Sequence, residues 1–495
     1  MGIGNILKKL QDIMRKDEGV NGDAQRLEQI VWILFLKVYD AKEQQWEFDD
    51  DNYKSIIPEN LRWRNWAKDN KDGLALTGEE LLNFVNNELF PKLKKLDINS
   101  ETPIKKAIVT YTFKDVNNYM KNGILLRQVI NVIDEIEFTN PNERHEFNDI
   151  YETMLKELQS AGNAGEFYTP RPVTNFMVEM LNPTLGEKVA DFACGTGGFL
   201  TSTLDYLKEQ KKTAEDIDIY NESIYGIEMK SLPYLLCITN LLLHDIDNPR
   251  VEHRNSFDRN IKEYTDNEKY DVILMNPPYG GSVLKEHLIN FPSSLRGSET
   301  ADLFIALIMY RLKLNGRVAV ILPDGFLFGT DNTKVNIKEK LLKDFNLHTI
   351  VRLPSSVFAP YTSITTNILF FDKTQSTDKV WFYRMDMPEG YKNFSKTKPI
   401  LNIHFNDVKE WWNNRKEIVD KKENEDATIT YKAKSYDVKE IINMNYNLDL
   451  CGYPHEEEII LEPKELIAQY QKKRASLNAE IDKILAEVSK LLEEE

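Results

Sequence analysis

The segment Tyr270 to Ser282, YDVILMNPPYGGS, holds an amide and an aromatic ring on a rigid corner. Its apolar run, Val272 to Met275, predicts a buried strand that stops at Asn276-Pro277-Pro278-Tyr279. Two consecutive prolines fix φ and remove two backbone donors, and a residue before proline is driven to extended geometry. The motif therefore offers hydrogen-bond acceptors and a flat ring at a strand end, with few backbone donors to compete for them.

Three other polar signatures follow predicted strands. Asp191 lies near the end of one strand, and a glycine-containing turn then opens a helix; the turn residues are Gly195, Thr196, Gly197 and Gly198. Glycines let the backbone approach a ligand closely, and a helix N-terminus offers free amides. Glu228 ends the next strand, where a carboxylate suits two ribose hydroxyls, and Asn255 follows the third. Each feature alone also fits a tight turn or a solvated strand end, but together they predict a ligand site at one sheet edge.

The elements that position these residues alternate between strands and helices from about residue 165. The predicted strands are Val189–Phe192, Ile224–Ile227, Val251–Arg254, Tyr270–Met275, Arg317–Leu322, Thr349–Leu353, Thr366–Phe371 and Val380–Tyr383. The predicted helices are Thr174–Leu181, Phe199–Glu209, Pro233–His244, Ala301–Leu314 and Asn332–Asp344. Such alternation predicts an α/β fold with a mostly parallel, doubly wound sheet. The short connection DKTQSTDK predicts an antiparallel hairpin of the last two strands.

The flanking regions look helical. Before the sheet, helical spacing predicts helices around residues 27–38, 78–96, 124–136 and 146–162. After residue 390 the strand signal fades, a polar helix is expected at Glu410 to Glu423, and a last helix follows Pro463. That last helix has a coiled-coil-like seam: Leu477, Ile481, Ile484, Val488 and Leu491. We therefore expect a helical domain at 1–160, the sheet domain at 161–390 and a helical region at 391–495 that docks on a partner, although the last helix could instead pack on its own domain.

Composition limits the class of protein. The chain has 495 residues and a net charge of −16, with 41% hydrophobic residues, which is typical of a folded chain of two or three domains. The three cysteines are far apart and the histidines lack ligand spacing, so neither a disulfide framework nor a metal site is expected. With no signal-peptide core and no membrane-length apolar run, a soluble cytoplasmic protein is predicted. The acidic charge argues against a chain that grips nucleic acid unaided.

The order of the motifs resembles the methyltransferases that transfer the methyl group of S-adenosyl-L-methionine (AdoMet) to exocyclic amino groups. The segment GEFYTPRPV, Gly165 to Val173, resembles the leading AdoMet-binding motif of the subclass in which the cofactor motifs precede NPPY. Together with the N-terminal helices and the later LPDGFLFG and SITTNILFF, the pattern is similar to the modification (M) subunit of type I restriction–modification systems. The resemblance implies a Rossmann-like AdoMet-dependent methyltransferase sheet with helical extensions at both ends.

The resemblance also implies roles for individual residues. The side-chain oxygen of Asn276 and the main-chain carbonyl of Pro277 would accept from the target amine, and Tyr279, after Pro278, would stack on a flipped base. Glu228 would bind the ribose and Asp191 would lie near the cofactor's amino group, while Asn255, where relatives often have Asp, would contact its adenine. The segment closing over the methionine end would be Glu166, Phe167, Tyr168, Thr169, Pro170 and Arg171, and the turn beneath it Gly195, Thr196, Gly197 and Gly198.

These features favour N6-adenine methylation of DNA, with the target adenine flipped out of the duplex. Transfer to cytosine N4, transfer to a protein glutamine and a non-catalytic AdoMet-binding scaffold remain alternatives. The resemblance implies a DNA-specificity (S) subunit as partner, with two M chains per S chain, and a restriction (R) subunit. The polar, glycine-flanked segment Gly280 to Thr300 is expected to be a loop that becomes ordered on DNA.

Overall fold

The computed structural model describes residues 3–68, 75–99, 101–136, 151–156, 168–281, 283–420 and 430–452, and residues 467, 470, 471, 474, 475, 478, 481 and 482 of a C-terminal helix. The chain divides into two compact units, Met1–Gly452 and Tyr453–Glu495. Of the helix expected at 146–162, only 151–156 is described, and it is helical. Of the predicted C-terminal seam, only Ile481 lies within the described residues. Every helix in the described ranges is too short or too polar to cross a membrane.

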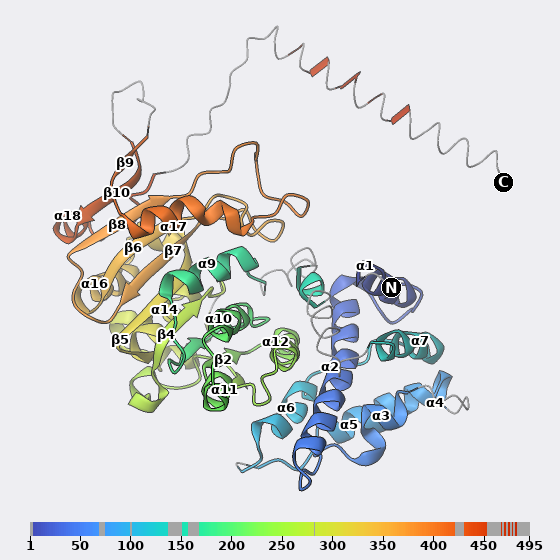
Figure 1. Cartoon of the computed structure of the whole chain (residues 1–495). Helices are drawn as coiled ribbons and strands as arrows, with labels where there is room; N and C mark the ends of the chain where they lie inside the picture. Colours follow the sequence, from blue (N-terminus) through green and yellow to red (C-terminus); the bar gives the residue numbers. More distant parts are fainter. Residues whose placement is uncertain are drawn as a thin grey trace. The chain divides into compact units, whose positions relative to one another are not determined.

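The first part of the larger unit is helical, as the sequence predicts. Its helices are α1 (Ile3–Met14), α2 (Gly22–Asp49), α3 (Trp63–Trp66), α4 (Gly78–Asn83), α5 (Phe90–Leu93), α6 (Ile104–Phe113) and α7 (Gly123–Asp134). The π-helical stretch Phe84–Leu89 joins α4 to α5, so the predicted helix at 78–96 is one helical run. The central helix α2 buries most of its middle, including the predicted apolar positions from Leu27 to Val38. These helices appear in blue to cyan in Figure 1.

The strands that follow form one mixed sheet. They are β1 (Val189–Asp191), β2 (Ile224–Glu228), β3 (Val251–His253), β4 (Tyr270–Met275), β5 (Leu312–Pro323), β6 (Asn346–Arg352), β7 (Thr366–Asp372), β8 (Lys379–Arg384), β9 (Ile418–Val419) and β10 (Tyr431–Asp437). Their order is β3-β2-β1-β4-β5-β7-β6-β8-β10-β9. Strands β1 to β5 pair parallel with one another, and β7 runs antiparallel between β5 and β6.

Two expectations about the far half of the sheet are wrong. The predicted β7–β8 hairpin does not form, because β7 is buried and uses both of its edges to pair with β5 and β6. Strand β8 instead pairs parallel with β6. After residue 390, α17 (Asn406–Asn413) replaces the helix expected at Glu410 to Glu423, and β9 and β10 extend the sheet. The sequence did not predict strand β10, because the strand lacks a hydrophobic run. Ala433 is its one fully buried residue.

Helices cover both faces of the sheet (Figure 1). The remaining helices are α9 (Arg171–Leu181), α10 (Gly198–Lys208), α11 (Ala214–Asn221), α12 (Ser231–Leu243), α13 (Lys285–Leu288), α14 (Thr300–Arg311), α15 (Asp324–Phe328), α16 (Asn332–Asp344) and α18 (Val438–Asn443). Alternate residues of β4 enter different cores: Ile273 packs with α14 and α16, and Leu274 packs with α9 and α17. Apolar residues of α10 and α12 join a third core with the N-terminal helices. Burial on both faces explains the continuous apolar runs of these strands.

Candidate functional site

A cavity of about 400 Å³ lies at the carboxyl ends of β1 to β4. The parallel register of these strands places the residues after them on one sheet edge, as the sequence predicts. Eight predicted site residues line the cavity: Thr169, Asp191, Gly195, Gly198, Glu228, Asn255, Asn276 and Pro278. Its volume lies in the range of small-molecule sites, about 300–1,000 Å³. The cavity therefore unites residues from the leading motif, the glycine turn and NPPY.

The other predicted residues lie beside the cavity or outside the described residues. Tyr168, Pro170, Arg171, Thr196, Gly197, Pro277 and Tyr279 are absent from its lining. Glu166 and Phe167 lie outside the described residues, so their predicted contacts stay predictions. The hydroxyl of Tyr279 nevertheless reaches a cavity residue, because it donates a hydrogen bond to Oδ1 of Asn276.

Two buried carboxylates face the cavity without a cationic side chain paired to either of them among the described ion pairs. Asp191 is 1% exposed and Glu228 is 6% exposed. Oδ1 of Asp191 accepts from the backbone N of Ala193 at 3.0 Å. Burial, with a smaller contribution from the nearby Glu228, raises the pKa of Asp191 to about 8, although the hydrogen bond from Ala193 opposes the shift. Burial also raises the pKa of Glu228. A ligand that brings positive charge or hydroxyl donors to this cavity would stabilise both charged forms.

The glycine turn is built around Glu228 and α10. The backbone N of Gly195 donates to Oε2 of Glu228 at 2.9 Å, and the N of Lys230 donates to Oε1 at 2.6 Å. Gly197 has a φ of +82°. A Cβ there would lie 2.8 Å from Sγ of Cys237, so glycine is required at this position by both conformation and space. The carboxylate thus orders the turn as well as facing the cavity.

Arg171 does not line the cavity, and its predicted place over the cofactor stays a prediction. Its guanidinium pairs with the carboxylate of Glu152 and donates from Nη1 to the carbonyl of Gly198 at 2.8 Å. Arg171 therefore ties α9 to the glycine turn and to the helical segment 151–156. The sequence could not show this, because Glu152 is brought to Arg171 by the fold.

Asn255 uses its amide oxygen locally. Oδ1 accepts from the backbone N of Phe257 at 2.9 Å, and Nδ2 lies 3.3 Å from Nε2 of His287. An oxygen already engaged by the backbone keeps one further lone pair for a ligand donor. His287 lines the same cavity, so it shares this corner with Asn255.

The NPPY motif is held by two hydroxyl groups. Nδ2 of Asn276 donates to Oγ1 of Thr169 at 3.1 Å, and Oδ1 accepts from the hydroxyl of Tyr279. Burial, and secondarily the nearby Tyr361, raise the pKa of Tyr279. Pro277 is buried, whereas Pro278 is exposed and lines the cavity. The amide of Asn276 is thus oriented, with its oxygen turned toward the tyrosine hydroxyl.

Much of the cavity wall was missed in the sequence. Its apolar part includes Phe257, Val283, Leu284 and Phe304, with Met229 and the backbone of Gly281. The segment after NPPY, which contains α13, therefore lines the cavity rather than only connecting elements. Thr300 fixes this segment by donating from its hydroxyl to the carbonyl of Gly281 at 2.7 Å. A pattern of isolated apolar residues in a polar segment was the one available signal. Among the described residues, no cluster of His, Cys, Asp and Glu could hold a metal ion.

Two family models match the chain. The model described as N-6 DNA Methylase matches residues 142–460. The model described as HsdM N-terminal domain matches residues 3–133. The gap between the two matches, residues 134–141, begins at the end of α7.

Known proteins match over nearly the whole chain. The type I restriction enzyme EcoEI methylase subunit of Escherichia coli is 49% identical over 479 residues, 96% of each chain. The EcoKI methylase subunit of Escherichia coli strain K12 is 28% identical, over 80% of this chain and 73% of its own. A crystal structure of a modification subunit assigned to a type I restriction enzyme of Vibrio vulnificus YJ016 has a TM-score of 0.77 and 42% identity, covering 93% of this chain and 98% of that one. A chain from a structural study of type I R-M complex assembly and conformational transition has a TM-score of 0.79 and 33% identity, covering 100% and 98%.

Proposed function

We propose that Asn276 and Pro277 hold the target adenine and that Asp191 and Glu228 hold the cofactor. The chain belongs to the methylase subunits of type I restriction–modification systems. The chain is an AdoMet-dependent enzyme subunit that methylates the N6 amino group of adenine in DNA. The family match disfavours cytosine N4, protein glutamine and the non-catalytic scaffold as alternatives.

The cavity fits AdoMet by its chemistry. AdoMet carries an ammonium, a sulfonium and two ribose hydroxyls, and the cavity presents two buried carboxylates without cationic partners among the described ion pairs. The aromatic side chains of Phe257 and Phe304 offer an apolar place for the adenine ring. In this arrangement Asp191 faces the ammonium, Glu228 accepts from the ribose hydroxyls, and Asn255 lies at the adenine edge with His287. Glu166 and Phe167 keep their role over the methionine end by resemblance.

The chain's own contribution to transfer is orientation. When bound, AdoMet supplies an activated methyl group with a good leaving group, so the protein need not provide a strong base. The adenine amine is a weak nucleophile because its lone pair is delocalised into the ring. Acceptors at Oδ1 of Asn276 and the carbonyl of Pro277 would bind its two N–H groups and turn the lone pair toward the methyl group. Tyr279 would stack on the flipped base.

The observation that carries these roles is the place of Asn276, which shares one cavity with both carboxylates. Substituting Asn276→Ala should leave AdoMet affinity within about twofold and lower transfer by about 10²-fold or more, as expected when a group acting in the transition state is lost. Calorimetric titration with AdoMet, beside transfer of tritiated methyl to DNA by the complex with the specificity subunit, tests this. A parallel loss of affinity and activity would move Asn276 to the cofactor site.

We also propose the arrangement of the complex. The chain has a helical domain at 1–160, a methyltransferase domain at 161–390 and a partner-docking region at 391–495. Strands β9 and β10 of the last region join the sheet. The C-terminal helix docks on the S subunit, with two M chains per S chain. An R subunit joins the complex for cleavage. A cytoplasmic location follows because the substrate is cellular DNA. Support comes from exposed apolar side chains on the described part of the helix, Ile467, Tyr470 and Ile481.

Deleting Glu462 to Glu495 tests the docking. The shortened chain should bind AdoMet with normal affinity but should no longer co-purify with the S subunit. Retained co-purification would assign the contact to another surface.

A further inference from the structure

The edge of the sheet that carries NPPY continues beyond the cofactor cavity. Because β7 is antiparallel to both β5 and β6, the strands β5 and β6 run in the same direction, and β8 runs parallel to β6. The registers pair Pro323 with Thr366, Asn367 with Arg352, and Arg352 with Arg384. The loops after β6 and β8 therefore leave the sheet on the same edge as the NPPY motif after β4.

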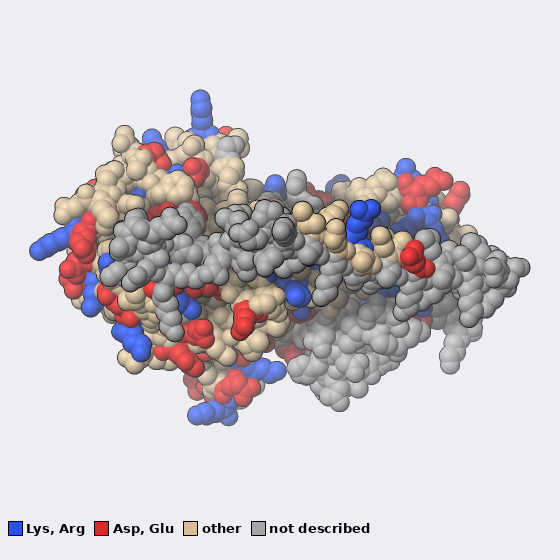
Figure 2. All heavy atoms as spheres, turned by 90° about the horizontal axis from the view of Figure 1, so that it is seen from above, with Lys and Arg blue, Asp and Glu red and all other residues tan. Residues whose placement is uncertain are grey.

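Apart from Asp386 and the exposed Glu389, which precede Tyr391 in the loop after β8, these two loops contain no acidic residue, although the chain as a whole is acidic. Phe345 to Phe371 contains no Asp or Glu, and neither does Tyr391 to Asn406, which has three lysines, although the net charge is −16. Lys392, Lys396 and Lys398 are all exposed. None of them takes part in an ion pair between described residues, whereas the nearby Asp386 pairs with Arg384 at 2.8 Å. On the face drawn in Figure 2, blue Lys and Arg side chains and red Asp and Glu side chains are mixed.

The lysine-bearing loop, residues 391–401, is fixed to the loop after β6. The backbone N of Phe394 donates to Oγ of Ser356 at 2.9 Å, and the Phe394 side chain is 4% exposed. Its ring packs against Tyr391 and His404, with centroid distances of 5.7 and 5.6 Å. Nζ of Lys398 lies 5.5 Å from the centroid of the Tyr391 ring. A loop held in this way would lose little conformational entropy when its lysines bind a ligand.

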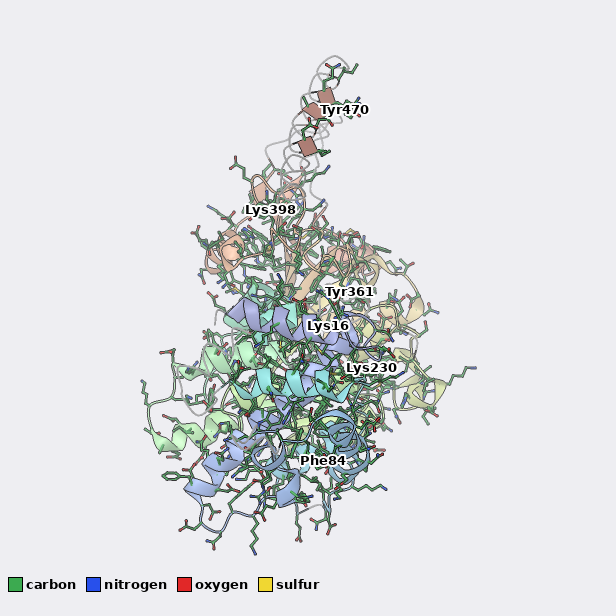
Figure 3. All side chains as sticks on the ribbon, turned by 90° about the vertical axis from the view of Figure 1, so that its right-hand side faces the viewer. Lys16, Phe84, Lys230, Tyr361, Lys398 and Tyr470 are labelled. Atoms are coloured by element: carbon green, nitrogen blue, oxygen red, sulfur yellow. The ribbon has the colours of Figure 1, made fainter. Side chains whose placement is uncertain are left out.

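The loop after β6 connects these lysines to the target-base site. Tyr361, at its exposed tip, is close enough to Tyr279 to raise the pKa of that phenol. In the view of Figure 3, Tyr361 lies between Lys230, a cavity residue, and Lys398. From β4 to β8 there are four strand spacings of about 4.8 Å, or about 19 Å, which is the axial length of five to six base pairs at about 3.4 Å each.

We propose that Lys392, Lys396 and Lys398 bind the phosphate backbone of duplex DNA about half a helical turn from the flipped adenine. Three exposed cations on a fixed loop suit a row of phosphates, since neutralising phosphates with release of counterions provides much of protein–DNA affinity. The surface gives an acidic chain a local contact with its substrate. The proposal rests on the proposed function, because it places the DNA by the position of Asn276.

The test uses the complex of this chain with its specificity subunit. One variant carries Lys392→Gln, Lys396→Gln and Lys398→Gln. A matched control carries Lys188→Gln, Lys208→Gln and Lys212→Gln. All three lysines are exposed on the opposite sheet edge: Lys188 precedes β1, Lys208 ends α10 and Lys212 follows α10. Both variants change the net charge equally. A fluorescent duplex of about 30 base pairs is titrated at several NaCl concentrations, and AdoMet affinity and kcat on DNA from an unmethylated host are measured.

The loop variant should reduce the slope of log Kd against log salt by up to about 2.7, because each phosphate contact contributes about 0.9. Its AdoMet affinity and its kcat at saturating DNA should stay within about twofold of the unmodified complex, and the control should keep the full slope. An unchanged slope, or an equal decrease in the control, would overturn the proposal. Failure of the proposed function would instead appear as Asn276→Ala transferring methyl groups normally, whatever the salt slopes.

Discussion

The hydrogen bond from Tyr279 to Asn276 occupies the acceptor that the target adenine needs. Oδ1 of Asn276 has two lone pairs, and an adenine amine that takes the one used by the tyrosine hydroxyl must displace that hydroxyl. A neutral hydrogen bond contributes about 0.5–1.5 kcal/mol net. Substituting Tyr279→Phe removes this competitor and keeps the aromatic ring. We therefore expect the apparent KM for DNA to fall by roughly twofold to tenfold.

The same variant separates the hydroxyl from the chemistry. If the hydroxyl acts only as a placeholder, kcat at saturating DNA should remain within about twofold, because no transition-state contact is lost. Tyr279→Ala should instead weaken base binding by about 1–3 kcal/mol, or roughly 5- to 150-fold, through loss of stacking. Both are measured by steady-state transfer of tritiated methyl groups with the complex containing the specificity subunit. A kcat of Tyr279→Phe reduced by about 10²-fold or more would refute the placeholder role.

Three further expectations concern the cavity. Glu228→Gln should lower AdoMet affinity by at least about tenfold, because charge-assisted hydrogen bonds contribute about 1.5–3 kcal/mol each, and saturating cofactor should restore much of the rate; unchanged affinity in titration would contradict the ribose role. Thr169→Val should lower kcat by roughly twofold to tenfold with little change in AdoMet affinity, and Thr169→Ser should restore it; a loss confined to affinity would make Thr169 a cofactor ligand only. Asp191 has a pKa raised to about 8, so the folded chain binds more protons than the unfolded chain between about pH 4 and 8. The stability of the chain without cofactor should therefore fall as pH rises through that window. AdoMet binding near pH 7 should release protons, seen as a buffer-dependent calorimetric enthalpy that Asp191→Asn abolishes.

Local chemistry made the first half of the sheet predictable. Strand β4 matches its predicted bounds, Tyr270–Met275, because it is a continuous apolar run ended by two prolines. Glu228 and Asn276 were found because polar residues follow several successive strands, and a ligand site at one sheet edge accounts for them together. The order of β7, β6 and β8 was not predictable, because a short connection is compatible both with a hairpin and with a crossing over one neighbouring strand.

Contacts between distant parts of the chain account for what the sequence did not show. The position of Arg171 depends on Glu152, and the corner at Asn255 depends on His287 from the segment after NPPY. Neither pairing follows from spacing. Thr169 was predicted only as a cofactor residue, and the structure adds that its hydroxyl accepts a hydrogen bond from Asn276.

The cofactor and target sites share their walls, so their binding equilibria should be coupled. Thr169 belongs to the leading cofactor motif and orients Asn276, while Leu284 and His287 follow NPPY and line the cofactor cavity. Occupying the cavity restricts both segments, and ordering NPPY for a base restricts the same cavity wall. Binding linkage requires that if AdoMet tightens DNA binding by some factor, DNA tightens AdoMet binding by the same factor. AdoMet is titrated with and without duplex, and duplex with and without AdoMet. The two ratios of dissociation constants, second ligand absent over second ligand present, should be equal and above one. Ratios equal to one would show that the shared wall does not couple the two sites.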